Sequence, residues 1–342
     1  MEPHRIDVGS PYFEDLHVGQ VFDDAPGVTL TTAHAAFHTA LFNDRLRLPL
    51  DAHLSRAVTG RAEPLVHPMV VCNVAIGQTT TSSQRVRGNL FYRGLLLREP
   101  VFIGDTLRTT TKVVGLNLNK ARPGRAATGM VALEVQVENQ DGATVLHYWR
   151  CPMIPCRDAW RTVGPVDSFD TIPPDLDPVA VRAAVPSTWR LDVYRERVPG
   201  THFAAVQANT EYVLESRDTV TSAPELARLT LNLAMTHTDA AASLYKKRLV
   251  YGGHTISMAA SHLTRALPNL VTIIGWRSCD HTAPVFEGDV LRTQILVEAV
   301  QPLGTGGLVE FRARVFAERG PEAPEPGTDI PVLDWRLVGL LA

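Results

Sequence analysis

Proton transfer is the chemistry that the residue types of this sequence favour, and one histidine stands out. His237 lies in the segment NLAMTHTD (232–239), two positions before Asp239. Imidazole changes its charge close to neutral pH, so this side chain can take up a proton and return it within one reaction. Asp239 has two interpretations, because its carboxylate either orients the imidazole or accepts hydrogen bonds from the backbone.

A pair of glycines could supply hydrogen-bond donors to a ligand. The segment YGGHT (251–255) comes just before a helical pattern, and Gly252 and Gly253 allow the backbone to approach a ligand closely. N–H groups at a helix N-terminus can stabilise negative charge that develops on an oxygen atom. His254 in the same turn either touches the substrate or is only a cap or surface group, and the sequence does not favour one over the other.

Motifs for other kinds of chemistry are missing. The sequence has no phosphate-binding glycine loop of the P-loop or Rossmann type, no Gly-x-Ser-x-Gly turn and no paired Cys/His spacing. Its four cysteines, Cys72, Cys151, Cys156 and Cys279, are too few and too irregularly spaced for a disulfide framework or a zinc site, so we interpret them as reduced and buried. We therefore expect acid–base catalysis without a metal or a redox cofactor.

Composition excludes several classes of partner. The chain has 342 residues, of which 45% are hydrophobic, and a formal net charge of -3. Such a chain lacks the basic excess that binds nucleic acid. No apolar run reaches membrane-spanning length, and the first residues lack the pattern of a signal peptide. We expect a cytoplasmic protein with no nucleic-acid or membrane partner.

A repeat divides the chain into two halves. PVFIGDTLRT (100–109) and PVFEGDVLRT (284–293) differ at only two positions, and PLVHP (64–68) and RLVYG (248–252) precede them at the same offset. A length of 342 residues also fits two domains. The sequence predicts a duplicated domain.

The repeated decapeptide itself is typical of a turn between two strands. Gly104 and Gly288 would supply the bend, and Asp105 and Asp289 would bind backbone N–H groups. Because it is equally well kept in both halves, we interpret it as a structural element.

Each half begins with a helical pattern and continues with strands. The helices are expected in AHAAFHTALFN (33–43) and TSAPELARLTLNLAM (221–235), each buried by a strongly curved antiparallel sheet of its own half. The predicted domains are residues 1–161 and 190–342, joined by a Pro- and Asp-rich linker at 162–189.

The sequence resembles the MaoC-like hydratase/dehydratases of the hotdog fold in their fused, double form. The residues that carry the resemblance are YFEDLHVGQVF (12–22), HTALFNDRLRLPLDAHL (38–54), GNLFYRGLLLREPVFIGDTL (88–107) and RLVYGGHTISMA (248–259). Within the family they are most similar to the mesaconyl-CoA hydratase (β-methylmalyl-CoA dehydratase) branch.

The resemblance implies a fold and an activity. The fold would be α+β, a tandem hotdog in which the halves pair as an internal pseudo-dimer, with the association of two chains left open. The activity would be that of a hydro-lyase that adds or removes water across the C2=C3 bond of a short enoyl-CoA, with branched and dicarboxylic acyl groups among the candidates. Coenzyme A would enter as part of the acyl-CoA substrate, with no separate cofactor.

Neither half keeps the whole signature of that family, Asp-x-Asn-Pro-φ-His-x-Asp, in which φ is apolar. In the second half, NLAMTHTD, His237 fills the histidine position but Asn232 replaces the aspartate. In the first half, DRLRLPLD (44–51), Asp44 keeps the carboxylate but Pro49 replaces the histidine.

Three interpretations of this departure are open. His237 is the acid–base group and Asn232 a hydrogen-bonding residue that orients water, because an amide can position water without a charge. Alternatively, Asp44 from one half faces His237 from the other. In the third interpretation both residues are structural. We favour the first.

Coenzyme A carries phosphates, so basic residues are expected near its binding site. The candidates are Arg85, Arg87, Arg93, Lys120, Arg122, Arg125, Lys246, Lys247 and Arg248, of which we select Arg93 and Arg248. A dicarboxylic acyl group would also require a cation inside the pocket, and Arg45 or Arg47, beside the aligned motif, is the candidate.

Two other functions compete with hydration. Hotdog proteins include thioesterases, which would release a free thiol from acyl-CoA. Because neither half has the complete motif, a catalytically idle acyl-CoA-binding protein is the second alternative.

Overall fold

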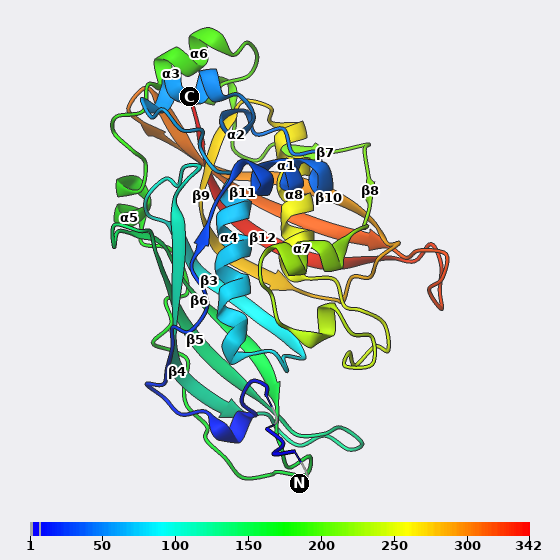
Figure 1. The fold of residues 1–342 in the computed structure, drawn as a ribbon. Helices are drawn as coiled ribbons and strands as arrows, with labels where there is room; N and C mark the ends of the chain where they lie inside the picture. Colours follow the sequence, from blue (N-terminus) through cyan, green and yellow to red (C-terminus); the bar gives the residue numbers. More distant parts are fainter. Residues whose placement is uncertain (1–2, 7) are drawn as a thin grey trace.

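One large antiparallel sheet organises the molecule. The computed structural model describes residues 3–6 and 8–342. Its main sheet has the strand order β1-β4-β5-β6-β3-β9-β12-β11-β10-β7, with β2 paired to β4 and β8 paired to β10 (Figure 1). None of the helices in these residues combines the length and the hydrophobicity needed to span a bilayer.

The two halves have nearly the same sequence of elements. The first half contains η1 (Phe13–Asp15), β1 (Val21–Phe22), β2 (Val28–Thr29), α1 (Thr32–Phe42), α2 (Arg47–Leu50), α3 (Ala52–Thr59), α4 (Pro68–Gln78), η2 (Thr79–Ser82), β3 (Gly88–Leu97), β4 (Thr106–Leu118), β5 (Thr128–Glu138) and β6 (Thr144–Pro155). The connecting segment contains α5 (Pro178–Ala183). The second half contains α6 (Leu191–Arg197), η3 (Phe203–Ala205), β7 (Glu211–Val213), β8 (Asp218–Thr219), α7 (Ala223–Leu229), η4 (Met235–His237), α8 (Gly252–Ala266), β9 (Leu270–His281), β10 (Val290–Leu303), β11 (Gly306–Glu318) and β12 (Asp329–Leu341).

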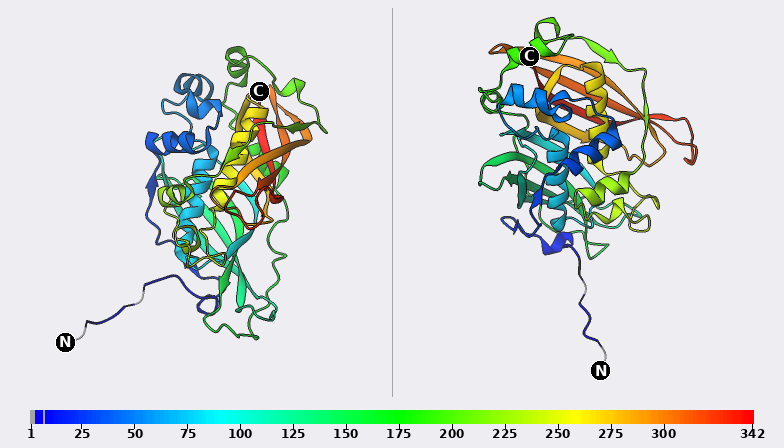
Figure 2. Two further views of the ribbon diagram at one scale, coloured as in Figure 1. Left: turned by 90° about the vertical axis from the view of Figure 1, so that its right-hand side faces the viewer. Right: turned by 45° about the horizontal axis from the view of Figure 1, so that its top comes forward.

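The halves are joined through their sheets and their central helices. Strands β3 and β9 pair antiparallel, with Tyr92 opposite Cys279. On the helical side, α4 and α8 lie against each other, and the Asn73 side chain of α4 donates to the Ser257 hydroxyl of α8 at 2.9 Å. Figure 2 shows both helices on the same face of the continuous sheet. The double hotdog expected from the sequence is therefore the observed architecture.

The helices that the sheet encloses are not the ones that the sequence patterns indicated. Residues 33–43 do form α1, but α7 is only seven residues long, and neither is the central helix. The central positions are taken by α4 and α8. All eleven residues of α4 are buried, so its sequence, PMVVCNVAIGQ, is apolar on every side and has no amphipathic period to detect.

The repeated decapeptide has the predicted turn structure in both halves. Gly104 has φ +103° and Gly288 has φ +90°, a backbone region that glycine adopts without strain. The Asp105 carboxylate accepts from the Phe102 N–H at 2.7 Å, and the Asp289 carboxylate accepts from the Phe286 N–H at 2.9 Å. The structural interpretation of this motif is confirmed.

The segment 162–189 packs onto the opposite face of the sheet. Successive side chains of a strand point to opposite faces, and β9 divides accordingly: Ile273 joins the core under the central helices, whereas Ile274 joins a second cluster. In that cluster Val181 and Trp189 cover the strands. The connection between the halves is therefore a packed part of the structure. The four cysteines are free and buried, as expected.

Candidate active site

A large cavity lies between the two halves. Its volume is about 330 Å³, and its walls come from α4, β3 and β6 of the first half and from residues 232–255 and β9 of the second. Among the described residues that line it there are three arginines, Arg87, Arg125 and Arg150, and two histidines, His237 and His281, but no aspartate or glutamate. The cavity is therefore suited to an anionic ligand and provides imidazole, without carboxylate, for proton transfer.

His237 is held with one ring nitrogen free. It ends η4, and its Nδ1 lies 2.8 Å from the Leu249 carbonyl oxygen, which can only accept, so Nδ1 carries the proton and Nε2 has the lone pair. Burial lowers the pKa of His237 to about 4, and the charge of Arg150 acts in the same direction. The ring is therefore neutral at pH 7 and can act as a base through Nε2.

Asn232 lies in the same cavity wall and has a fixed orientation. Its side-chain oxygen accepts from the Ala234 N–H at 2.9 Å, which leaves the NH₂ group to donate. Asp44 makes the matching contact in the first half, with the Leu46 N–H at 2.9 Å. The two segments therefore fold alike, in agreement with their alignment in the sequence.

The helix α8 begins at the cavity, where Gly252 forms part of the wall. The first N–H groups of a helix have no acceptor within the helix, so they are available to a ligand. A Cβ atom at position 252 would lie 2.6 Å from Nε2 of His281, which explains the glycine. His281 itself lines the cavity. Burial lowers its pKa to about 4, and the neighbouring His237 acts in the same direction.

Asp44 belongs to a different, buried cluster. Its carboxylate lies 3.1 Å from His67 Nε2 and accepts from the Thr264 hydroxyl at 3.1 Å. His67 Nδ1 accepts from the Met69 N–H, so Nε2 carries the proton and cannot be a metal ligand while this cap is kept. The structure therefore does not bring Asp44 together with His237, and the Asp44 cluster is better explained by hydrogen bonding than by metal binding.

His38 completes this cluster and makes the fold sensitive to acid. Burial lowers its pKa to about 3, and the neighbouring His67 also lowers it. The unfolded chain takes up this proton below about pH 6.5 but the folded chain does not, so the stability is complete above 6.5 and is lost as the pH falls toward 3. At pH 5 this single group lowers the free energy of unfolding by about 2 kcal/mol. We expect His38→Leu to reduce the loss of unfolding free energy between pH 7.5 and pH 5 by about that amount.

Urea unfolding of both proteins at the two pH values tests this. The exposed His53 provides the control, because His53→Leu makes the same substitution outside the buried cluster. Equal pH dependence in His38→Leu and the wild type would contradict the assignment.

The other residues selected from the sequence lie outside the cavity wall. Asp239 is exposed, and its carboxylate accepts from the Ala241 N–H at 2.8 Å. Gly253 faces α4, where a Cβ atom would lie 2.1 Å from Asn73 Oδ1. His254 is buried beside Phe42, with Nε2 2.9 Å from the Thr221 carbonyl. These three residues have structural partners outside the cavity.

The basic residues selected to bind phosphate or carboxylate lie partly inside and partly outside the cavity wall. Arg93 pairs with Asp280 and Arg248 with Glu287, each at 2.7 Å, and neither lines the cavity. Of the other basic candidates, Arg87 and Arg125 do line it and the remainder do not: Arg45, Arg47, Arg85, Lys120, Arg122, Lys246 and Lys247.

Sequence reasoning missed two cavity residues, Arg150 and His281. Arg150 lies on β6 in a predicted strand, where an arginine is usually on the wetted face, and nothing in its neighbourhood indicated burial. For His281 the repeat held a signal, since its counterpart 184 positions earlier is Leu97, and a polar residue at an apolar position of a duplicated core marks a difference between the halves.

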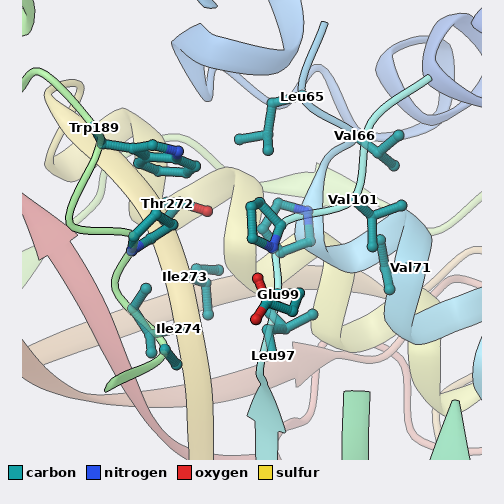
Figure 3. Close-up of a pocket in the computed structure, with 14 residues that line it drawn as sticks. Leu65, Val66, Val71, Leu97, Glu99, Val101, Trp189, Thr272, Ile273 and Ile274 are labelled. Carbon is teal, nitrogen blue, oxygen red and sulfur yellow. The ribbon is translucent and has the colours of Figure 1, made fainter. Parts of the chain in front are cut away.

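The duplication produces a second crevice, which is much smaller. It is lined by Leu65, Val66, Pro68, Val71 and Leu97, and the main cavity has Leu249, Val250, Gly252, Thr255 and His281 at the matching positions. Here Ala184, Pro186 and Trp189 of the segment 162–189 complete the wall, and the volume is only about 30 Å³. Figure 3 shows Trp189 facing Leu65 and Thr272 across this crevice. Of these two cavities, the main one is large enough for an acyl group and the second crevice is not.

Comparison with known proteins agrees with the fold. The family model of mesaconyl-CoA hydratase matches residues 5–267. The β-methylmalyl-CoA dehydratase of Chloroflexus aurantiacus is 30% identical over 94% of this chain and 91% of its own length. The mesaconyl-CoA hydratase of Cereibacter sphaeroides is 28% identical over 96% of this chain and 97% of its own length.

Solved structures extend the similarity. The double-hotdog protein Rv0216 of Mycobacterium tuberculosis is 47% identical, with a TM-score of 0.91, covering 98% of this chain and 100% of the other. A MaoC domain protein dehydratase from Chloroflexus aurantiacus is 25% identical, with a TM-score of 0.78 and 97% coverage of both chains.

The fold and these relatives define a double-hotdog, MaoC-like hydratase/dehydratase, which is a hydro-lyase. Within that class, the chain belongs to the mesaconyl-CoA hydratase family.

Proposed function

We propose that the 330 Å³ cavity is the active site and that His237 transfers the proton in the hydration of an enoyl-CoA. Water attacks C3 while its proton passes to Nε2 of His237. The C2=C3 electrons move toward the thioester carbonyl and give an enolate, which then takes the proton at C2. Dehydration follows the same path in reverse.

The arrangement of the cavity supports this assignment of roles. The free Nε2 of a neutral His237 is the observation that carries it, because a base must have a lone pair available at the operating pH. The Asn232 amide would donate to or position the water, and the Gly252 N–H at the start of α8 would stabilise the enolate oxygen.

The substrate that we propose is a short, dicarboxylic acyl-CoA of the mesaconyl or β-methylmalyl type. The relatives with these names cover nearly the whole chain. The exposed Arg125 and the half-buried Arg87 lie at the cavity and could bind the phosphates of coenzyme A. The four buried, free cysteines are compatible with a cytoplasmic location.

A panel of enoyl-CoA thioesters tests the proposal. Hydration removes the conjugated double bond, so we expect its ultraviolet absorbance to fall and a 3-hydroxyacyl-CoA to be the product found by mass spectrometry. Free thiol is measured in parallel. Thiol release in place of the hydroxyacyl-CoA would mean a thioesterase, and binding without either product would mean an idle acyl-CoA-binding protein.

A further inference from the structure

Arg150 is a buried cation without an acidic partner. Its side chain is 3% exposed and lines the cavity. Nε donates to Asn89 Oδ1 at 3.1 Å and Nη1 to Thr79 Oγ1 at 2.5 Å, both of them neutral acceptors. Within residues 3–6 and 8–342, no carboxylate lies within ion-pair distance of the guanidinium and Nη2 has no hydrogen-bond partner.

Such a charge is costly to bury. Removing a guanidinium from water costs several kcal/mol unless an anion compensates for it, and arginines are almost never fully buried unless paired. Partly buried arginines of the sheet do have acidic partners: Arg312, for example, lies 2.5 Å from Asp334. The cavity therefore contains a cation whose partner must come from a ligand.

The duplication provides an internal comparison at this position. In the first half Arg150 lies opposite Tyr92, and in the second half Leu337 lies opposite Trp276, the counterpart of Tyr92. Thr79 and Asn89 likewise correspond to Leu263 and Ile273 in the sequence repeat, and these second-half residues are all buried in the apolar core. The fold is thus satisfied by leucine here, so the guanidinium and both of its acceptors are not required for folding.

We infer that Arg150 binds the distal carboxylate of the acyl group. Thr79 and Asn89 hold the guanidinium so that the remaining N–H groups of Nη1 and Nη2 face the ligand. This inference deepens the proposed function and rests on it. A guanidinium can form two parallel hydrogen bonds with a carboxylate, which gives both affinity and orientation. Burial also separates the roles of the arginines, because only Arg150 lies deep enough to meet the acyl end while the coenzyme A phosphates stay near Arg87 and Arg125.

The matched substrates are mesaconyl-CoA, in which C2 carries a methyl group and C3 a carboxylate, and 2-methylbut-2-enoyl-CoA, in which a methyl group replaces that carboxylate. We expect the wild type to prefer the dicarboxylic substrate and Arg150→Leu, which copies the second half, to lower kcat/KM for it about fiftyfold. The neutral substrate should change less than about threefold. Arg150→Lys should recover part of the preference, since it restores the charge but not the planar fork.

Several readouts separate this role from a merely structural one. Arg150 lowers the pKa of His237, so in Arg150→Leu the acid limb of the kcat/KM profile should move to higher pH. The control is Arg312→Met on β11, which should leave the substrate preference unchanged. Equal losses on both substrates, or a wild type that hydrates both equally well, would overturn the inference. A wild type that hydrates neither would instead overturn the proposed function.

Discussion

Replacing His237 by asparagine should lower kcat by a factor of about 10² to 10⁴, the range for loss of a general acid–base group. Asparagine is the sharpest substitution, because its NH₂ group can keep the hydrogen bond to the Leu249 carbonyl while the basic nitrogen Nε2 disappears. The measurement is the steady-state loss of enoyl-CoA absorbance. Unchanged KM with reduced kcat would show that substrate binding survives.

The pH dependence of the wild type adds a second readout for His237. Because burial lowers the pKa of this ring to about 4, the neutral, basic form persists as the pH falls through 6.5 and is lost only near 4. Activity limited by His237 should therefore remain on the plateau at pH 6, under conditions in which the fold is intact. His53→Asn, on the exposed surface of α3, is the control for a histidine substitution. A His237→Asn variant with wild-type kcat would exclude the mechanism.

The architecture could be predicted from the sequence because duplication leaves signals that do not depend on tertiary contacts. The decapeptides 100–109 and 284–293 form equivalent turns because the same glycine and aspartate positions impose the same backbone. The central helix α4 could not be predicted in the same way. It is surrounded by protein, so no polar face marks it as a helix, and its apolar run is equally compatible with a strand.

The candidate site was only partly accessible to sequence reasoning, for a related reason. His237, Asn232 and Gly252 were placed through a motif and a local helix start, and the structure gathers them around one cavity. Arg150 and His281 come from strands distant in sequence, and their roles depend on burial and on missing partners. Those properties arise from the packing of one half on the other and have no local pattern.

The two halves contribute different residues to the cavity. The cavity combines the sheet of the first half, which supplies Arg150, with the loop of the second half, which supplies His237. The reciprocal combination keeps Asp44 and His67 but seals the crevice with Trp189. A duplicated fold can lose one site in this way when Asp44 and His67 pair with each other and the apolar surface is covered. This is consistent with the loss of the family histidine at Pro49 in the first half.

A glycine lies where the loop that carries Asn232 and His237 meets the first half, and we expect Gly77→Ala to disrupt both stability and activity. A Cβ atom at position 77 would lie 1.7 Å from the Thr230 carbonyl oxygen, a backbone atom that cannot rotate away. Thr230 lies two residues before Asn232, so relief of the overlap must move the loop that carries Asn232 and His237. In the matching place of the other half, the Ser261 hydroxyl donates to the Phe42 carbonyl at 2.6 Å, so there the backbones already stand farther apart.

We expect Gly77→Ala to lower the free energy of unfolding by about 3 kcal/mol or more, as overpacking against rigid backbone does, and to lower kcat beyond the loss explained by unfolded protein. Urea unfolding and the hydration assay on the folded fraction measure the two effects. Gly27→Ala is the matched control, since the nearest neighbour of its Cβ is a flexible side-chain atom, Cγ2 of Thr106, at 3.3 Å. Wild-type stability and kcat in Gly77→Ala would mean that the loop is not held by this contact, and the position of His237 would then need another explanation.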